Sequence, residues 1–177
     1  SVKITATGKA AHAAFPTIGD NAATRLLKYI NNIYHNSFLT HLEEIDYYAL
    51  ENPQYLGGDK LTDESGTLTS SIGVLEYKDN ELLIKTNLRV PVNTNFEQLE
   101  ERCKETLPDL NFYFEQANPK LYISKDNHLV QTLTKIFNET TGLNAKPLAI
   151  GGGTYARAFD NCISYGMSMP HEEELSH

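Results

Sequence analysis

The sequence predicts an α+β protein in two parts: an open-faced sandwich, with helices on one face of a mainly antiparallel sheet, and then an incomplete α/β segment. Three observations predict this class. Two strand-like runs, 68–77 and 82–90, are separated by a short polar turn, as in an antiparallel hairpin. Helical patterns with capping residues stand before and after this hairpin. Beyond an Ala-Asn-Pro break at 117–119, the pattern changes to helix, strand, glycine turn and helix, which is typical of α/β units.

The first part is expected to open with a strand and a helix. Apolar and polar residues alternate over 2–6, as they do in a half-buried strand. A loop over 8–20 follows. Asp20 or Asn21 can then cap a helix whose apolar stripe continues to Tyr34.

The middle of the first part holds the hairpin. A weaker helical pattern covers 38–50, and a turn-rich loop with Asn-Pro and Gly-Gly pairs covers 51–66. The polar turn of the hairpin is expected at 78–81. Asn95 then caps another helix, with Gln98 in the third helical position as a capping box requires.

The end of the first part is expected to return to the sheet. Pro108 lies beyond the end of the helix, and Phe112 and Phe114 indicate a last strand. The order strand, helix, helix, hairpin, helix, strand matches an open-faced sandwich. Residues 1–118 are therefore predicted to form one domain and residues 119–177 to belong to another.

The second part has an α/β order. Asp126 is the expected cap of a helix that ends at Gly142. A strand over 147–150, a glycine loop, a short helix and a strand over 163–166 should follow. This order places the glycine loop at the carboxyl end of a strand, where α/β folds bind ligands.

Composition and charge exclude several classes of protein. The chain has 177 residues, of which 40% are hydrophobic and 21% charged, as in ordinary globular proteins. Its net charge of −8 argues against nucleic acid or an anionic membrane as the main partner. No stretch is apolar enough to span a bilayer. Cys103 and Cys162 stand far apart and are expected to be buried free thiols, which favours a reducing compartment such as the cytoplasm.

The glycine loop is the strongest candidate for a site. Gly151, Gly152 and Gly153 end a short apolar run, and Thr154 follows at a position where it can cap a helix. The spacing fits neither a Walker loop nor the dinucleotide fingerprint. A tight turn without a ligand is one interpretation. The other is a cradle of backbone N–H groups for a carboxylate or an oxyanion.

The histidines near the end of the chain do not form the helical zinc motif. That motif needs a second histidine four positions after the first, but Leu175 stands four positions after His171. The last residue, His177, is by its position alone a surface histidine. It can also ligate a metal through a neutral ring nitrogen.

Two further residues could contact a substrate. His12 lies among small residues just after the first expected strand, and the small neighbours leave room for a ligand. Arg89 lies near the end of a strand with largely uncharged neighbours. It could pair with a carboxylate of this acidic chain, or hold a substrate carboxylate by two hydrogen bonds.

Five segments, in this order, resemble the zinc aminoacylase, carnosinase and PepV-type dipeptidase family, the ArgE/DapE-like metallopeptidases of clan MH. They span nearly the whole chain: Gly8-Lys9-Ala10-Ala11-His12, Gly19-Asp20-Asn21-Ala22-Ala23, Asn87-Leu88-Arg89-Val90-Pro91, Gly151-Gly152-Gly153-Thr154-Tyr155 and Ser176-His177. The Gly-Gly-Gly-Thr-Tyr segment and its spacing to the final histidine favour the PepV-like dipeptidase branch.

The resemblance implies a catalytic domain that binds two zinc ions and a smaller lid domain inserted within it. His12 would be the lid histidine that stabilises the oxyanion of the tetrahedral intermediate. Arg89 would grip the C-terminal carboxylate of the dipeptide. The loop Gly151–Thr154 would line the substrate site from the catalytic domain, and His177 would ligate one zinc ion.

The family's His-x-Asp motif does not occur in this sequence. The chain is therefore expected to supply substrate-gripping groups and at most one zinc ligand, and to be inactive alone. Its expected partners are the dipeptide, the missing N-terminal catalytic segment of the same enzyme and a second copy paired through the lid.

Three other interpretations remain open at this point. The parent enzyme could hydrolyse N-acyl amino acids, or a succinylated diamine, instead of dipeptides. The chain could be a stand-alone binding or dimerisation module, because an exposed sheet edge and apolar surface favour self-association. It could also bind a small anion through the glycine loop.

Overall fold

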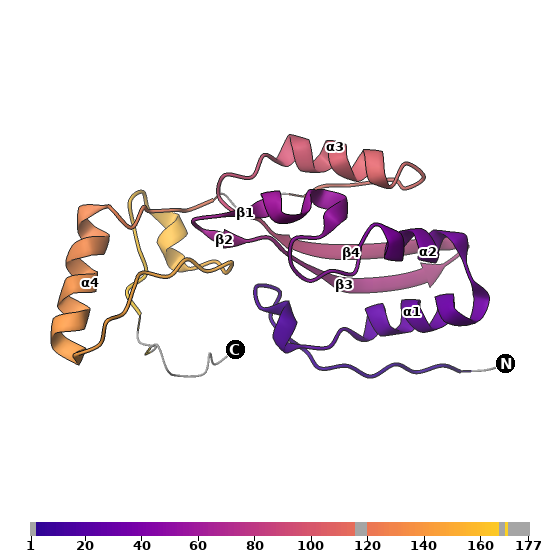
Figure 1. Ribbon diagram of the computed structural model, residues 1–177, viewed down its shortest axis with the longest axis horizontal. Coiled ribbons are helices and arrows are strands. Elements are labelled where there is room, and N and C mark those ends of the chain that lie inside the picture. The colour runs from indigo at the N-terminus through magenta and orange to yellow at the C-terminus, as the bar shows by residue number, and fades with distance from the viewer. Residues whose placement is uncertain (1–2, 116–119, 167–168, 170–177) are drawn as a thin grey trace. The chain divides into compact units, whose positions relative to one another are not determined.

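The computed structural model describes residues 3–115, 120–166 and 169, and the chain is α+β as predicted (Figure 1). It divides into two compact units, Ser1–Phe114 and Glu115–His177. All the strands found in the described ranges belong to two small antiparallel sheets of the first unit.

The hairpin forms within one residue of the predicted bounds. Strand β3 (Thr69–Lys78) pairs antiparallel with β4 (Glu81–Arg89). The turn between them consists of Asp79 and Asn80, with φ values of 52° and 67°. Two consecutive residues with positive φ match the right-handed twist of the strands, and Asn and Asp adopt this conformation at little cost.

A bulge at Gly73 decides which side chains of β3 face the core. Ile72 pairs with Thr86, whereas Val74 pairs with Lys85, so one residue of β3 is left without a partner. As a result Ile72 and Leu75 both contact the core, while Val74 is 42% exposed. Without the extra residue, strict alternation would turn Val74 inward and Leu75 outward.

Three helices and the hairpin, all drawn in Figure 1, contribute side chains to one core. The helices are α1 (Ala22–Tyr34), α2 (Ser37–Glu44) and α3 (Phe96–Thr106). Asn21, Asn36 and Asn95 cap them: Asn21 and Asn95 each accept two hydrogen bonds from backbone N–H groups of the first turn, and Asn36 accepts one, from Leu39 N–H. Helix α2 is shorter than the predicted 38–50, because the chain turns after Glu44 and reaches positive φ at Asp46.

The core of the first unit joins these helices to the hairpin and to the loop after α2. Leu42 and Leu68 have no exposed surface, and Leu107 is 1% exposed. Three short 3-10 helices add to the unit: Pro16–Ile18, Gln54–Leu56 and Gly58–Leu61. The buried core residues are Leu27, Leu39, Leu42, Tyr47, Tyr55, Leu56, Leu61, Leu68, Ile72, Leu99, Cys103 and Leu107.

The strands predicted at 2–6 and at 112–114 are wrong for the described residues. Val2 lies outside them, residues 3–6 form no strand, and neither do residues 112–114. Phe112 and Phe114 nevertheless pack against the core. The alternation correctly predicted side-chain burial, but a strand also needs a backbone partner.

A small ribbon forms inside the loop predicted at 51–66. Strand β1 (Thr62–Asp63) pairs with β2 (Gly66–Thr67). At its own start, β3 also pairs with residues 50–52, since Ser70 N–H donates to the Leu50 carbonyl and Asn52 N–H to the Leu68 carbonyl. The first residues of β3 are thereby hydrogen-bonded on both edges.

The second unit holds one α-helix in its described part. Helix α4 (His128–Thr141) is capped by Asn127 rather than by the predicted Asp126, and it ends at Gly142 with φ of 72°. The expected short helix is a 3-10 turn, Tyr155–Ala158. The strands predicted at 147–150 and 163–166 do not form. No helix of the described residues is long and apolar enough to cross a membrane.

Candidate functional site

His12 lies in a loop whose base is closed by backbone hydrogen bonds. Lys9 N–H donates to the Asp20 carbonyl and Asp20 N–H to the Lys9 carbonyl, each over 2.9 Å. A Cβ atom on Gly8 would overlap the Asp20 carbonyl oxygen, and one on Gly19 would lie 2.6 Å from the Ala11 Cβ. The glycines of both motifs are therefore needed where the two ends of the loop approach each other.

Within this loop, the His12 carbonyl accepts a hydrogen bond from Phe15 N–H over 2.9 Å. Ala14 and Pro16 are buried, whereas His12 is exposed. Figure 1 shows the loop, in indigo, at the end of the hairpin away from its turn. An exposed histidine in a loop that is anchored by buried Ala14 and Pro16 can present its ring to a ligand.

A backbone contact orients the His12 ring. Ala14 N–H donates to His12 Nδ1 over 3.3 Å. Because Nδ1 accepts, a neutral ring carries its proton on Nε2. His12 Nε2 is then a hydrogen-bond donor, as the stabilisation of a developing oxyanion requires.

Arg89 is the last residue of β4 and is half-buried. Thr86 and Leu88 face the core, so strand alternation places Arg89 on the opposite, outer face of the hairpin. Thr69 lies directly across from Arg89 and shares that face. Thr69 Oγ1 donates to the Ala13 carbonyl over 2.9 Å. This contact attaches the His12 loop to the residue that pairs with Arg89 in the hairpin.

The segment after Arg89 is held by residues that the sequence analysis did not single out. Asp63 Oδ2 accepts from Asn93 N–H over 2.8 Å, and Ser65 Oγ accepts from Val92 N–H over 2.9 Å. Asp63 Oδ1 also accepts from the N–H and hydroxyl of Ser65. The signal was an Asp-x-Ser-Gly turn, which indicates local side-chain hydrogen bonds but not their distant partners.

The glycine loop lies in the second unit and has a cationic neighbour. Arg157 Nη2 donates to the Gly152 carbonyl over 3.4 Å, and Arg157 Nη1 would be 2.7 Å from a Cβ on Gly153. Thr154 occupies the cap position of the following 3-10 turn, but its side chain makes no capping hydrogen bond. No sequence pattern pointed to a role for Arg157, since its contact with the loop depends on the backbone path.

His177, the predicted zinc ligand, lies outside the described residues, as does His171. Among the residues that are described, no three His, Cys, Asp or Glu side chains are grouped so that they could hold a metal ion. The described part of the chain therefore does not by itself form a zinc site.

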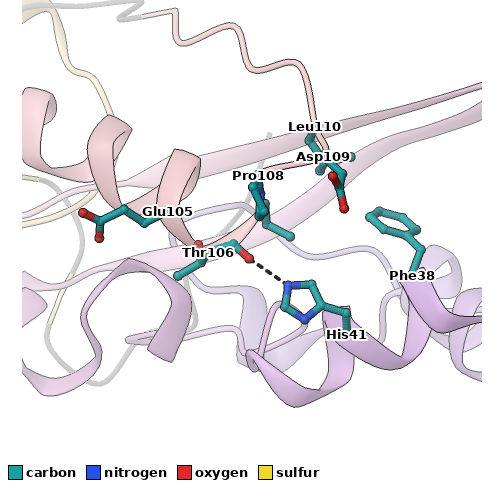
Figure 2. A pocket seen from close by; sticks show the side chains of 8 residues that line it. Phe38, His41, Glu105, Thr106, Pro108, Asp109 and Leu110 are labelled. Atoms are coloured by element: carbon teal, nitrogen blue, oxygen red, sulfur yellow. Dashed lines mark hydrogen bonds between the residues drawn. The ribbon is translucent and has the colours of Figure 1, made fainter.

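A cavity of about 300 Å³ lies between α2 and the end of α3, as Figure 2 shows. His41 Nε2 is 2.7 Å from the Thr106 carbonyl oxygen at its edge. The cavity contains none of the predicted site residues. The hydrogen bond fixes α2 to the end of α3, which is a structural role.

The strongest pKa shifts belong to buried groups of the core. Burial raises the pKa of the Cys103 thiol to about 12, with Glu100 adding to the shift. Burial likewise raises the pKa of Tyr48 to about 12 and raises that of Tyr47. These groups stay neutral near pH 7, and Tyr47 donates to or accepts from Thr86 within the core. Cys103 and Cys162 are both free, but only Cys103 is fully buried.

Comparison with known proteins matches residues 1–113 to the family described as "Peptidase dimerisation domain" (M20_dimer). The chain is also 31% identical over 182 aligned residues to the "Putative dipeptidase" of Staphylococcus epidermidis strain ATCC 12228 and to those of Staphylococcus aureus strains USA300 and NCTC 8325. Each alignment covers 98% of this chain and 38% of the relative, so the chain spans about two fifths of these relatives' length. On these matches and on the fold of its first unit, the chain belongs to the M20 peptidase family and carries its dimerisation domain.

Proposed function

We propose that this chain is part of a zinc-dependent dipeptidase, to which it contributes the lid and a C-terminal segment of the catalytic domain. The names of the relatives and the match to a peptidase domain support the reaction class. Residues 1–118 would be the lid and residues 119–177 the catalytic-domain segment. Most zinc ligands would come from outside these 177 residues, so the chain would be inactive alone.

The observation that supports this proposal is that Thr69 contacts the His12 loop and pairs with Arg89 in the hairpin. The two residues belong to segments joined through Thr69, on the outer face of the hairpin. A guanidinium can hold a carboxylate by two parallel hydrogen bonds. A histidine N–H donor can stabilise the negative oxygen that develops when water adds to a peptide carbonyl. A dipeptide offers both groups, a C-terminal carboxylate and a scissile carbonyl one residue before it.

The resemblance implies two zinc ions, and His177 would hold one of them. The metal would activate the attacking water and polarise the carbonyl. Gly151, Gly152, Gly153 and Thr154 would line the substrate site, and the Arg157 cation beside Gly152 is compatible with an anionic ligand there. In this assignment Arg89 binds the substrate and His12 acts on the transition state.

The full-length protein that contains this chain provides the test. Arg89→Ala should raise KM for a free dipeptide, while the corresponding dipeptide amide, which lacks the carboxylate, should react poorly with both proteins. His12→Ala should lower kcat by about 10²–10³, the usual loss of one oxyanion donor. Full activity of either variant on free dipeptides would contradict the assignment. A chelator should abolish activity, and added zinc should restore it.

An N-acyl amino acid is the second candidate substrate, because it carries the same carboxylate next to an amide. The two candidates differ only on the N-terminal side of the scissile bond, and Arg89 does not distinguish them. Comparison of kcat/KM for a dipeptide and its N-acetylated amino acid analogue would decide between them.

We further propose that the protein pairs with a second copy through the lid and works in the cytoplasm. The matched family supports the pairing, since it is described as a dimerisation domain. The two free cysteines are compatible with a reducing compartment. Sedimentation of the full-length protein over a range of concentrations would test the dimer.

A further inference from the structure

Thr69 is the point at which three separate segments of the first unit meet. Its strand is hydrogen-bonded to residues 50–52 on one edge, and Thr69 lies across from Arg89 on the other. Its hydroxyl donates to the Ala13 carbonyl over 2.9 Å. Thr69 is only 7% exposed. The Thr69 backbone is paired on both edges of its strand and its side chain is buried, so the hydroxyl has little freedom to move.

The strand register shows which face of the hairpin carries the Thr69 side chain. Side chains directly opposite each other in an antiparallel pair have Cβ atoms about 4.5–5.5 Å apart and stand on the same face. The Thr69 hydroxyl therefore binds the His12 loop on the face that carries Arg89. Ala13 is the next residue after His12, so one peptide unit separates the bound carbonyl from the histidine.

We infer that Thr69 is a positioning residue that sets the spacing between His12 and Arg89, and thereby favours substrates with one residue after the scissile bond. The inference rests on the proposed function, in which Arg89 holds the carboxylate and His12 contacts the carbonyl oxygen. A fixed spacing matches one substrate length. In a tripeptide cleaved at its first bond, the carboxylate lies a further residue away and misses Arg89.

The loop has its own internal closure, so loss of the Thr69 contact would shift it without unfolding it. Lys9 and Asp20 close its base, and Phe15 N–H binds the His12 carbonyl. Removal of the Thr69 hydroxyl releases the Ala13 carbonyl, which lies beyond that base. Misplacement of a catalytic group by about 1 Å can cost on the order of 10²-fold in rate.

The test uses the full-length protein with three variants. Thr69→Val keeps the shape and the β-propensity but removes the donor, Thr69→Ser keeps the donor, and Thr69→Ala serves if valine disturbs the strand. For a dipeptide, Thr69→Val should lower kcat by about 10-fold or more and change KM less than 2-fold, because only the transition-state contact moves. The preference for a dipeptide over cleavage of a tripeptide at its first bond, followed by identification of the products, should fall, and Thr69→Ser should restore both kcat and this preference.

A structural readout on the 177-residue chain accompanies the kinetics. In Thr69→Val, the Ala14 amide, which donates to His12 Nδ1, should exchange its hydrogen faster, while the amides of Lys9, Asp20, β3 and β4 keep their protection. Wild-type kcat and an unchanged dipeptide preference in Thr69→Val would overturn the inference, as would equal defects in the Val and Ser variants. If instead His12→Ala and Arg89→Ala were fully active, the proposed function would fail, and the two failures are thus distinguishable.

Discussion

The two units of this chain contrast in how they bury their apolar side chains. In the first unit, residues from three helices, the hairpin and the connecting loops form one core. In the described part of the second unit, Val130 and Ala156 are buried, whereas Leu148, Tyr155 and Phe159 are 85%, 96% and 66% exposed. The same kind of apolar sequence pattern thus produced a closed core in one unit and exposed surface in the other.

This contrast shows that a pattern becomes structure only where its partners are present. The hairpin of the first unit pairs two adjacent runs, and its helices cover one face. The runs at 147–150 and 163–166 find no strand to pair with in the described residues. In the proposed dipeptidase, the rest of the catalytic domain would cover them. Three substitution pairs and one comparison of two thiols test how far the contrast holds. Each should be followed by residue-resolved methods, because two units need not unfold together.

The largest effect is expected for a leucine in the closed core. Leu42→Ala should destabilise the first unit by about 2–5 kcal/mol, since Leu42 has no exposed surface and its loss leaves a cavity. Leu148→Ala in the second unit should change stability by less than about 0.5 kcal/mol, because Leu148 is 85% exposed. Amide hydrogen exchange of β3 and α4 measures both. Equal losses in the two variants would show that Leu148 is covered in solution.

The second pair compares a glycine that the fold requires, Gly8, with one proposed to line the substrate site, Gly152. Gly8→Ala should destabilise the His12 loop by about 1–3 kcal/mol, because its Cβ would overlap the Asp20 carbonyl. A Cβ on Gly152 would meet Ile150 Cδ1 at 3.8 Å, an ordinary contact, so Gly152→Ala should leave the fold intact. Amide exchange at Lys9 and Asp20 tests the first. If Gly152→Ala retained full activity in the full-length protein, the glycine loop would not line the substrate site closely.

The third pair compares the stability that a helix cap contributes in each unit. Asn21→Ala should cost about 1–2 kcal/mol, because Asn21 caps α1 and its Nδ2 also donates to the Ile72 carbonyl over 2.7 Å. Asn127→Ala should cost less, about 0.5–1 kcal/mol, since Asn127 caps α4 through one bond to Leu129 N–H. Thermal or urea unfolding with exchange readout at each helix gives both values. A larger loss for Asn127→Ala would reverse the ranking of the two units.

The smallest effect is expected for the pH dependence of stability that the buried Cys103 thiol causes. The folded pKa of Cys103 is raised from 9.0 to about 12, so its contribution to stability is complete below pH 9 and is lost between pH 9 and 12. Urea unfolding of the first unit should therefore become easier from pH 9 to 10, and Cys103→Ala should flatten that slope. Tyr48 adds its own loss only above pH 10.

Cys162 provides the control for this pH experiment. Because Cys162 is half-buried, a thiol reagent should label it in the folded chain at pH 8, while Cys103 is labelled only on unfolding. Rapid labelling of Cys103 in the folded chain would contradict the closed core. An unchanged slope between pH 9 and 10 in Cys103→Ala would contradict the buried Cys103 thiol as its cause.

The sequence by itself determined the elements that depend on neighbouring residues. The hairpin, the asparagine caps of α1 and α3, and the end of α4 at Gly142 all follow local rules of turn and cap chemistry. The glycines around His12 were visible as a motif, although the reason for them, a close approach of two backbone segments, was not. His12 and Arg89 could be proposed only one by one.

Only the tertiary structure decided what depends on residues distant in sequence. It placed Thr69 between the His12 loop and Arg89, and Arg157 against Gly152. It also left Phe112 and Phe114 packed on the core without forming a strand. The physical reason is common to all three. Alternation and capping are properties of a few consecutive residues, whereas a strand, a loop contact or a binding site needs a partner whose position is set by the whole fold.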